Sequence, residues 1–381
     1  MLTLIENGSV FAPEPRGRRA VLLVGDRIAR VGEVDRDALE RSGLELVVID
    51  ASDCVVTPGF IDPHEHLIGG SGERGFSTQT PEITLGEIAG AGITTVVGCL
   101  GVDTTTKTMP ALLARAKALG EEGLTAFIWS GGYNVPPTTL TGSLRTDMLF
   151  VEEVIGAGEV AISDTRATEP TLEELARLVS EAHTGGMLSR KAGVTHFHVG
   201  DHRARLRPLR DLVEAYAVEP GWLYPTHVER NRELMREAAA FTRTGAFVDI
   251  DTMEEDLPEQ LRFFIDDGGD LRQLTVSSDA AISSPRTLSG QLRACVIEYK
   301  HPLEEVLPLV TANTARALSL ERKGRLVPGC DADVLVLRRD SLELVEVIAR
   351  GQRMVSGGRL IVTEKFLAHS NRSISLYGRK P

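Results

Sequence analysis

The sequence predicts an α/β fold, a (β/α)8 TIM-like barrel with a small β-sandwich domain built from both chain ends. From residue 55 onward, short apolar runs rich in β-branched residues alternate with amphipathic stretches. That alternation is typical of βα units repeated around a parallel sheet. Eight such runs can be counted, which is the number that closes a barrel. On both sides of this region the helical pattern stops and short strand patterns replace it.

The predicted barrel strands are short and evenly distributed. They span residues 54–61, 93–98, 125–131, 159–163, 194–199, 222–227, 246–250 and 273–279. Clear helical patterns lie between several of them, at residues 80–92, 112–123, 171–186 and 230–245. In these patterns apolar residues recur every three or four positions and a glycine closes the last turn. The barrel domain is therefore expected over residues 55–323.

The two flanking segments alternate apolar and polar residues, with turn residues between the runs. This pattern covers residues 1–54 and 324–365. Each segment is too short to bury a core of its own, so we expect both to pair into one β-sandwich domain beside the barrel. The tail, residues 366–381, is polar and is expected to be loose.

The amino-acid composition argues against some kinds of binding partner. The net charge of -12 argues against nucleic-acid binding, because phosphate contacts need a basic face. The four cysteines lie far apart without a CxxC motif, which fits reduced thiols buried as small apolar residues. The start of the sequence does not resemble a secretory signal, and no apolar run is long enough to span a bilayer. We expect a cytoplasmic protein that acts on small molecules, away from membranes.

Polar side chains end several of the predicted strands, where barrel active sites lie. In strand order they are His64, His66, Glu159, His198, His227 and Asp279. Residues two apart in a strand face the same side, so His64 and His66 can bind one ion together. Imidazole and carboxylate ligands suit a pair of Zn²⁺-like ions, which hold a bridging hydroxide and polarise a carbonyl group.

Each of these residues alone also fits an ordinary structural role. A single histidine at a strand end is more often a hydrogen-bonded structural residue, and a single acid is more often a helix cap or a solvated loop carboxylate. Their common position at one end of one barrel favours the metal site. Glu65 faces away from its histidine neighbours and is expected to be structural. His196 shares the strand face of His198, so it is either a residue that supports a metal ligand or a packed core histidine.

Several motifs in the chain resemble the amidohydrolase superfamily. They are "GFIDPHEH", "HFHVGD", "PTHVER", "SSD" and the flanking segment "GRLVPGCDADVLVL". More narrowly, "HLIGGSGERG", "SGGYNVP", "AISDTR" and "THVERN" resemble the isoaspartyl (β-aspartyl) dipeptidase family, over nearly the whole chain to about Lys365. The resemblance implies a binuclear zinc enzyme, a homo-oligomer, that hydrolyses small β-aspartyl dipeptides.

The resemblance also implies roles for individual residues. His64 and His66 would hold the more buried metal with Asp279, and His198 and His227 the more exposed one. Asp279 would take a proton from the bridging hydroxide and deliver it to the leaving amine. The remaining roles concern the substrate: Tyr133 stabilises the oxyanion, Arg166 clamps the leaving residue's carboxylate, Arg230 and Ser283 hold the α-carboxylate, and Glu73 holds the ammonium group. Without the resemblance, ordinary packing or surface roles would explain these residues better.

Two positions depart from the family pattern. Val102 stands where the family tends to place a threonine near the substrate. Glu159 stands where the family has a side-chain-carboxylated lysine that bridges the metals, and Lys191 is poorly placed to substitute for it. A glutamate offers the two oxygens of a bridge but is shorter by roughly 3.5 to 4 Å. One extra small residue in "GAGE" is expected to form a bulge that brings the strand closer to the metals.

Three functions stay open on the sequence alone. The first is an isoaspartyl dipeptidase with a glutamate-bridged metal pair. A related amidohydrolase that acts on N-acyl amino acids or cyclic amides is favoured if Val102 has changed the pocket. The third is a non-catalytic interaction protein on the same scaffold, although such proteins usually lose metal ligands and here every ligand position is filled.

Overall fold

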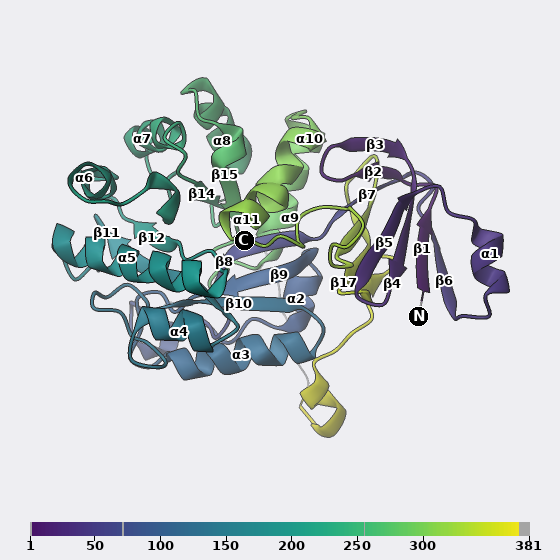
Figure 1. Ribbon diagram of the computed structural model, residues 1–381, viewed down its shortest axis with the longest axis horizontal. Helices are drawn as coiled ribbons and strands as arrows, with labels where there is room; N and C mark the ends of the chain where they lie inside the picture. The colour runs from purple at the N-terminus through teal and green to yellow at the C-terminus, as the bar shows by residue number, and fades with distance from the viewer. Residues whose placement is uncertain (1, 71, 255, 373–381) are drawn as a thin grey trace.

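Eight consecutive parallel strands form the predicted barrel in the computed structural model, which describes residues 2–70, 72–254 and 256–372 (Figure 1). They are β8 (Phe60–Glu65), β9 (Ile93–Gly98), β10 (Thr125–Ser130), β11 (Val154–Ile162), β12 (Thr195–Val199), β13 (Leu223–Thr226), β14 (Val248–Asp251) and β15 (Leu274–Ser277). Strands β8 to β13 form one hydrogen-bonded sheet and β14 pairs with β15. The His66 N–H donates to the Ala280 carbonyl oxygen at 2.9 Å, which joins the first strand to the end of the last.

Helices cover the outer face of the barrel (Figure 1). They are α2 (Leu85–Ala89), α3 (Met109–Glu121), α4 (Leu144–Phe150), α5 (Leu172–Ser189), α6 (Arg207–Ala215), α7 (Arg232–Thr242), α8 (Leu257–Asp266), α9 (Arg286–Arg293), α10 (Leu303–Val306) and α11 (Ala312–Ala317). The four predicted helical patterns correspond to α2, α3, α5 and α7. Helix α5 begins with a capping box, in which Thr171 and Glu174 each bond the other's backbone N–H.

The first predicted strand, residues 54–61, is wrong as a single element. The structure divides it into β7 (Cys54–Pro58), in the end sheet, and β8 in the barrel. The division falls at Gly59, whose N–H donates to the Asp333 carbonyl, while the next N–H, of Phe60, donates to the Gly92 carbonyl. A Cβ at residue 59 would lie 2.2 Å from the Thr94 hydroxyl, so only glycine fits where the chain passes between the sheets.

Both chain ends build the predicted β-sandwich. One sheet has the order β5-β4-β1-β6, formed by Arg27–Gly32, Ala20–Val24, Leu2–Glu6 and Leu46–Asp50, with α1 (Arg36–Arg41) before its last strand. The other has the order β19-β18-β17-β16-β7-β2-β3, formed by Arg359–Leu360, Gln352–Ser356, Leu344–Ala349, Val334–Arg338, Cys54–Pro58, Ser9–Phe11 and Pro15–Arg18. Their inner faces share an apolar core that includes Ile5, Leu23, Val56, Val336 and Ile348. The exact domain boundaries stay predictions.

The start of the tail has local structure. Lys365–His369 form a 3-10 helix, and the Lys365 N–H donates to the Glu122 carboxylate on the barrel. The tail was expected to be loose over residues 366–381, and its last part, residues 373–381, lies outside the described residues. Within the described ranges, no helix has the length and apolarity needed to cross a bilayer.

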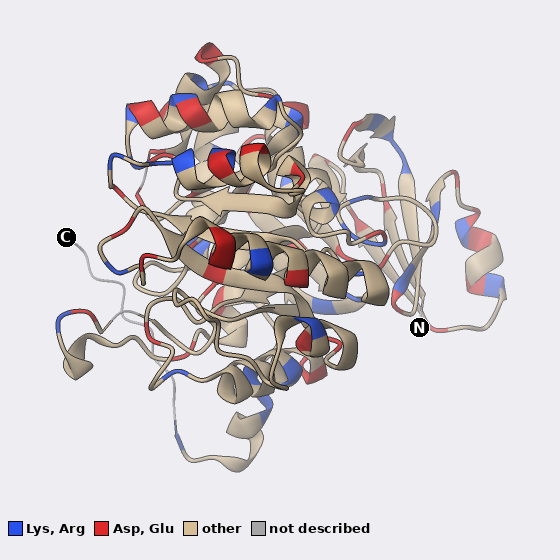
Figure 2. Cartoon of the chain, turned by 60° about the vertical axis from the view of Figure 1, so that its left-hand side comes forward, with Lys and Arg blue, Asp and Glu red and all other residues tan. Residues whose placement is uncertain are grey.

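All four cysteines lie buried within the described chain and form no disulfide there. They are therefore reduced thiols, as their spacing predicts. Charged side chains are interspersed on the outer helices, where Figure 2 shows acidic and basic segments following one another. One example is the exposed pair of Glu173 and Arg177 on α5.

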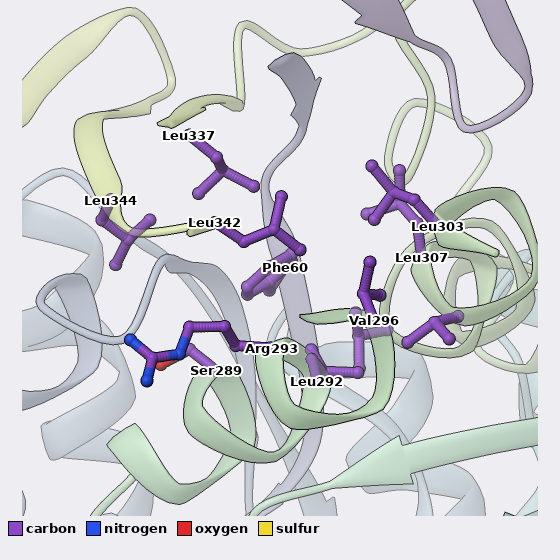
Figure 3. Close-up of a pocket in the computed structure, with 12 residues that line it drawn as sticks. Phe60, Ser289, Leu292, Arg293, Val296, Leu303, Leu307, Leu337, Leu342 and Leu344 are labelled. Carbon is purple, nitrogen blue, oxygen red and sulfur yellow. The ribbon is translucent and has the colours of Figure 1, made fainter. Parts of the chain in front are cut away.

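An apolar contact joins the barrel to the end sheet (Figure 3). Phe60, the first residue of β8, lies there between Leu292 of α9 and Leu337 and Leu344 of the end sheet. The side chains leave a cavity of only about 30 Å³, and Phe60 is 5% exposed. This ring is therefore closely packed in the contact between the barrel and the end sheet.

We predict that Phe60→Ala lowers the free energy of unfolding by about 3–5 kcal/mol, because it leaves a void that the surrounding leucines cannot close. Phe150→Ala is the control, since Phe150 is 76% exposed and its truncation should change stability by about 0.5 kcal/mol or less. Denaturant unfolding of both variants measures the difference. Similar midpoints for the two variants would contradict the assigned role of Phe60.

Candidate metal centre and substrate cavity

The carboxyl end of the barrel brings the six predicted metal ligands together. These side chains are His64, His66, Glu159, His198, His227 and Asp279. Each lies in a barrel strand or in the one or two residues that follow it. All except the partly exposed Asp279 are buried. The parallel strands place their ends at one edge of the barrel, so residues far apart in sequence become neighbours.

Glu159 lies at the centre of this group. Its Oε2 atom is 3.3 Å from His64 Nε2. Its Oε1 atom is 2.6 Å from His198 Nδ1 and 3.2 Å from His227 Nε2. The two oxygens therefore face two different sets of imidazoles, as a bridging carboxylate would require.

Asp279 completes the first of these sets. Its Oδ1 atom lies 3.3 Å from His64 Nε2 and 3.2 Å from His66 Nε2. Its backbone has a φ of 45°, and His227 has a φ of 62°. Non-glycine residues rarely adopt this left-handed conformation, and strain of this kind concentrates at functional sites.

A local irregularity in β11 positions Glu159. The register of β11 against β12 shifts between Ala157 and Val160, as the extra residue in "GAGE" predicts. Gly158 has a φ of 142°, and a Cβ there would lie 2.7 Å from the His196 carbonyl oxygen. Only glycine allows this close approach of the two strands.

His196 contacts the ring nitrogen of His64 that does not face Glu159. Its Nδ1 atom lies 3.0 Å from the Tyr224 carbonyl oxygen, which only accepts hydrogen bonds, so this nitrogen carries the proton. The Nε2 atom of a neutral His196 is then an acceptor, and it lies 3.1 Å from His64 Nδ1. His64 Nδ1 must therefore donate, so Nε2 is the nitrogen that faces Glu159 and Asp279 and would bind a metal ion.

Two carboxylates that the sequence interpretation missed support the other imidazoles. Asp164 Oδ2 lies 3.1 Å from His198 Nε2, and Asp251 Oδ2 lies 2.6 Å from His227 Nδ1. Carboxylates of this kind orient a metal-ligating histidine, and Arg166 also contacts His198, with its terminal nitrogen 2.9 Å from His198 Nε2. Asp251 is the last residue of β14. The search for polar residues at the ends of strands, which found the proposed ligands, could therefore also have found Asp251.

The donor set fits divalent metal ions. His64 Nε2 and Glu159 Oε2 are buried and have no hydrogen-bond partner among the described residues, although both face the centre of the group. Burial raises the pKa of Glu159, but the nearby His64 and His198 outweigh it and hold that pKa well below its usual range. Glu159 is therefore an anion at neutral pH. Nitrogen and oxygen donors of this kind are typical zinc ligands.

A cavity of about 960 Å³ opens above the group. Among the residues that line it are four predicted substrate residues and the unusual valine: Glu73, Tyr133, Arg166, Arg230 and Val102. Ser283, the other predicted substrate residue, is not among the lining residues, and its hydroxyl is buried without a hydrogen-bond partner in the described chain.

The two predicted carboxylate clamps differ in their surroundings. Arg166 is already engaged, because its Nε and one terminal nitrogen donate to Asp164 at 2.8 Å and the other terminal nitrogen donates to Glu73 at 2.7 Å. The Nε atom of Arg230 is buried and has no partner in the described residues. Arg230 is therefore the freer donor for a ligand carboxylate in the cavity.

Lys191 lies away from this centre. Its ammonium group donates to the carbonyl oxygens of Met148 and Val151, at 2.8 Å and 2.5 Å. Those carbonyls lie at the end of α4 and just before β11, at the opposite end of the barrel strands from Glu159. Lys191 does not reach the imidazoles.

We predict that His196→Phe weakens the binding of one zinc ion by about 10- to 100-fold, because the ring is kept but the hydrogen bond that sets the His64 tautomer is lost. The control is His183→Phe, since His183 stacks on Trp222, outside this group. Equilibrium dialysis of both variants against Zn²⁺ gives the affinities. Equal affinities in the two variants would remove His196 from the metal centre.

Comparisons with known proteins agree with this arrangement. The amidohydrolase family model matches residues 55–357. The β-aspartyl dipeptidase of Fervidobacterium islandicum AW-1, solved in complex with the β-Asp-Leu dipeptide, is 36% identical, with a TM-score of 0.90 over 96% of this chain and 100% of that chain. A second structure of that enzyme is 37% identical, with the same coverage and TM-score.

More distant relatives also match the chain, in sequence or in structure. An imidazolonepropionase of Ruegeria sp. (strain TM1040) is 26% identical over 353 residues, which cover 83% of this chain and 86% of the relative. A D-hydantoinase structure is 18% identical with a TM-score of 0.64, which shows the shared fold alone. The resemblance inferred from the sequence motifs is confirmed, and the chain belongs to the amidohydrolase family.

Proposed function

We propose that this amidohydrolase is a metal-dependent dipeptidase that cleaves β-aspartyl dipeptides. The observation that carries the proposal is the Glu159 carboxylate, whose two oxygens face separate imidazole sets below a cavity that Arg230 lines. The similarity to the Fervidobacterium islandicum enzyme, over 96% of this chain, supports the substrate class.

The six ligands would hold two divalent cations, such as Zn²⁺. His64, His66 and Asp279 would hold one, His198 and His227 the other, and Glu159 would bridge them. When bound, such cations polarise a scissile carbonyl group and lower the pKa of water.

Asp279 would carry the proton during hydrolysis. Burial raises its pKa, but the adjacent His64 and His66 outweigh this effect and lower the pKa below its usual value. The carboxylate is therefore ionised at neutral pH and accepts the proton of the attacking water. It then returns that proton to the amine as the peptide C–N bond breaks, which releases aspartate and the second amino acid.

Tyr133 would stabilise the charge that develops on the carbonyl oxygen. Its hydroxyl lies 2.7 Å from His198 Nδ1, and burial and the nearby Glu159 raise its pKa well above 10. The phenol therefore keeps its proton and can donate a hydrogen bond to an oxyanion.

The substrate's charged ends would bind to the polar residues of the cavity. Arg230 would hold the α-carboxylate of the isoaspartyl residue, and Glu73 would hold its ammonium group. Ser283 does not line the cavity in this structure, so its hydroxyl would have to turn toward the substrate to act as a second donor. Arg166 would hold the carboxylate of the leaving residue. Because Arg166 donates to Glu73 in this structure, substrate binding requires the two side chains to separate.

Val102 favours a second candidate function. This apolar residue lines the cavity at the position where the resemblance implies a threonine, so one hydrogen bond to a dipeptide is lost. A pocket altered in this way could suit N-acyl amino acids or cyclic amides.

A hydrolysis screen tests these candidates. With the zinc-loaded protein, β-Asp-Leu should be cleaved and α-Asp-Leu should not, because the isomers place their two carboxylates at different separations. N-acetyl amino acids and a hydantoin complete the panel. Equal rates on both dipeptides would refute the dipeptidase proposal, and faster cleavage of the acyl or cyclic substrates would support the second candidate.

Arg230→Lys should reduce kcat/KM for β-Asp-Leu by more than about tenfold, because an ammonium group cannot replace the two-point contact of a guanidinium group. The matched control is Arg236→Lys on α7, where the side chain is 61% exposed and pairs with Asp267. Steady-state kinetics of both variants provide the comparison. A value for Arg230→Lys equal to that of the control would place Arg230 outside the binding site.

A further inference from the structure

Cys99 is buried beside His66, in the first set of proposed ligands. It follows β9 and has no exposed surface. Its Sγ atom lies 3.6 Å from His66 Nδ1 and 3.9 Å from His66 Nε2. The sulfur also lies 3.6 Å from the Glu65 carbonyl oxygen, a distance at which a thiol makes only a weak hydrogen bond.

The sulfur belongs to a compact group of possible donors. One donor atom each from Cys99, His64, His66 and Glu159 lies within 4.8 Å of the others. A second observation points to a ligand at this place, because His64 Nε2 and Glu159 Oε2 are fully buried and have no hydrogen-bond partner in the described chain. The group therefore combines a buried thiol with two buried donor atoms that make no hydrogen bond within the described chain.

We propose that the Cys99 thiolate is an additional ligand of the metal ion held by His64 and His66. The inference rests on the proposed metal-dependent function. On metal binding the S–H bond breaks, its proton passes to solvent, and the sulfur electron pair forms the bond to the ion. No oxidant or reductant takes part.

A Cys99 thiolate ligand would affect the ion selectivity of the site and the role of Asp279 as a metal ligand. Two imidazole nitrogens, one sulfur and one carboxylate oxygen form a four-donor set typical of zinc, and thiolate selects against Mn²⁺ and Mg²⁺. Asp279 is not part of this four-donor group. With Cys99 as a ligand, the first ion depends less on Asp279, which leaves that carboxylate freer to carry the proton.

The other cysteines provide matched controls. Cys295 is buried like Cys99, but no candidate group of metal ligands in the described residues contains it. A serine at position 295 therefore removes a buried thiol without touching the proposed site.

X-ray absorption at the zinc edge tests the proposal directly on the zinc-loaded full chain. A sulfur shell at about 2.3 Å is expected in the wild-type protein and in Cys295→Ser, and it should be lost in Cys99→Ser. A wild-type spectrum with only nitrogen and oxygen neighbours would overturn the proposal, whether or not any variant folds. If the sulfur shell is present but β-Asp-Leu is not cleaved, the proposed function fails and the ligand assignment stands.

Ion selectivity gives a second readout that does not depend on activity. Cys99→Ser should weaken Zn²⁺ binding by more than about tenfold and Mn²⁺ binding by clearly less, because only the softer ion gains from sulfur. Competitive dialysis against both ions measures the ratio for Cys99→Ser and Cys295→Ser. The same loss for both ions in Cys99→Ser would contradict a direct sulfur contact.

Discussion

The candidate metal centre at the carboxyl end of the barrel depends on one constraint. The short Glu159 side chain must reach two sets of imidazoles at once. A lysine-based bridge could begin farther away, but a glutamate requires the backbone itself to approach. The register shift in β11 and the close contact of Gly158 with the His196 backbone provide that approach. His196 in turn bonds His64, so the residue that limits the strand spacing also orients a proposed ligand.

The candidate metal ligands are buried, so each hydrogen bond or ion pair that they make has a larger effect on their charge state than it would have in water. A carboxylate without partners in an apolar interior would take up a proton, yet adjacent imidazoles keep Glu159 ionised. The supporting contacts of His196, Asp164 and Asp251 each occupy the ring nitrogen that does not face the centre. The three imidazoles are thereby held with their other nitrogen directed inward, which is the preorganisation that a metal site needs.

Much of this picture could be predicted from the sequence, because the barrel is regular. Strand periodicity places His64, His66, His198 and His227 at one edge, and the extra residue in "GAGE" predicts the irregularity in β11. Periodicity does not show which side chains meet across the barrel.

The missed residues illustrate this limit. Asp164 and Asp251 contact imidazoles on neighbouring strands, and the role of His196 depends on a backbone carbonyl of β13. Cys99 has the signature of a small core residue, and only the closed barrel brings its sulfur beside His66. The single strand expected over residues 54–61 failed for a similar reason, since the neighbours on each side of Gly59 come from different sheets.

The central claim is that Glu159, and no carboxylated lysine, bridges the metals. The most direct measurement strips the protein of metal and restores Zn²⁺ in CO₂-free buffer, with and without added bicarbonate. A glutamate needs no CO₂ to become a carboxylate, and the pKa of Glu159 is held well below its usual range, so two zinc ions and full β-Asp-Leu hydrolysis should return equally fast in both buffers. A requirement for bicarbonate would contradict the account.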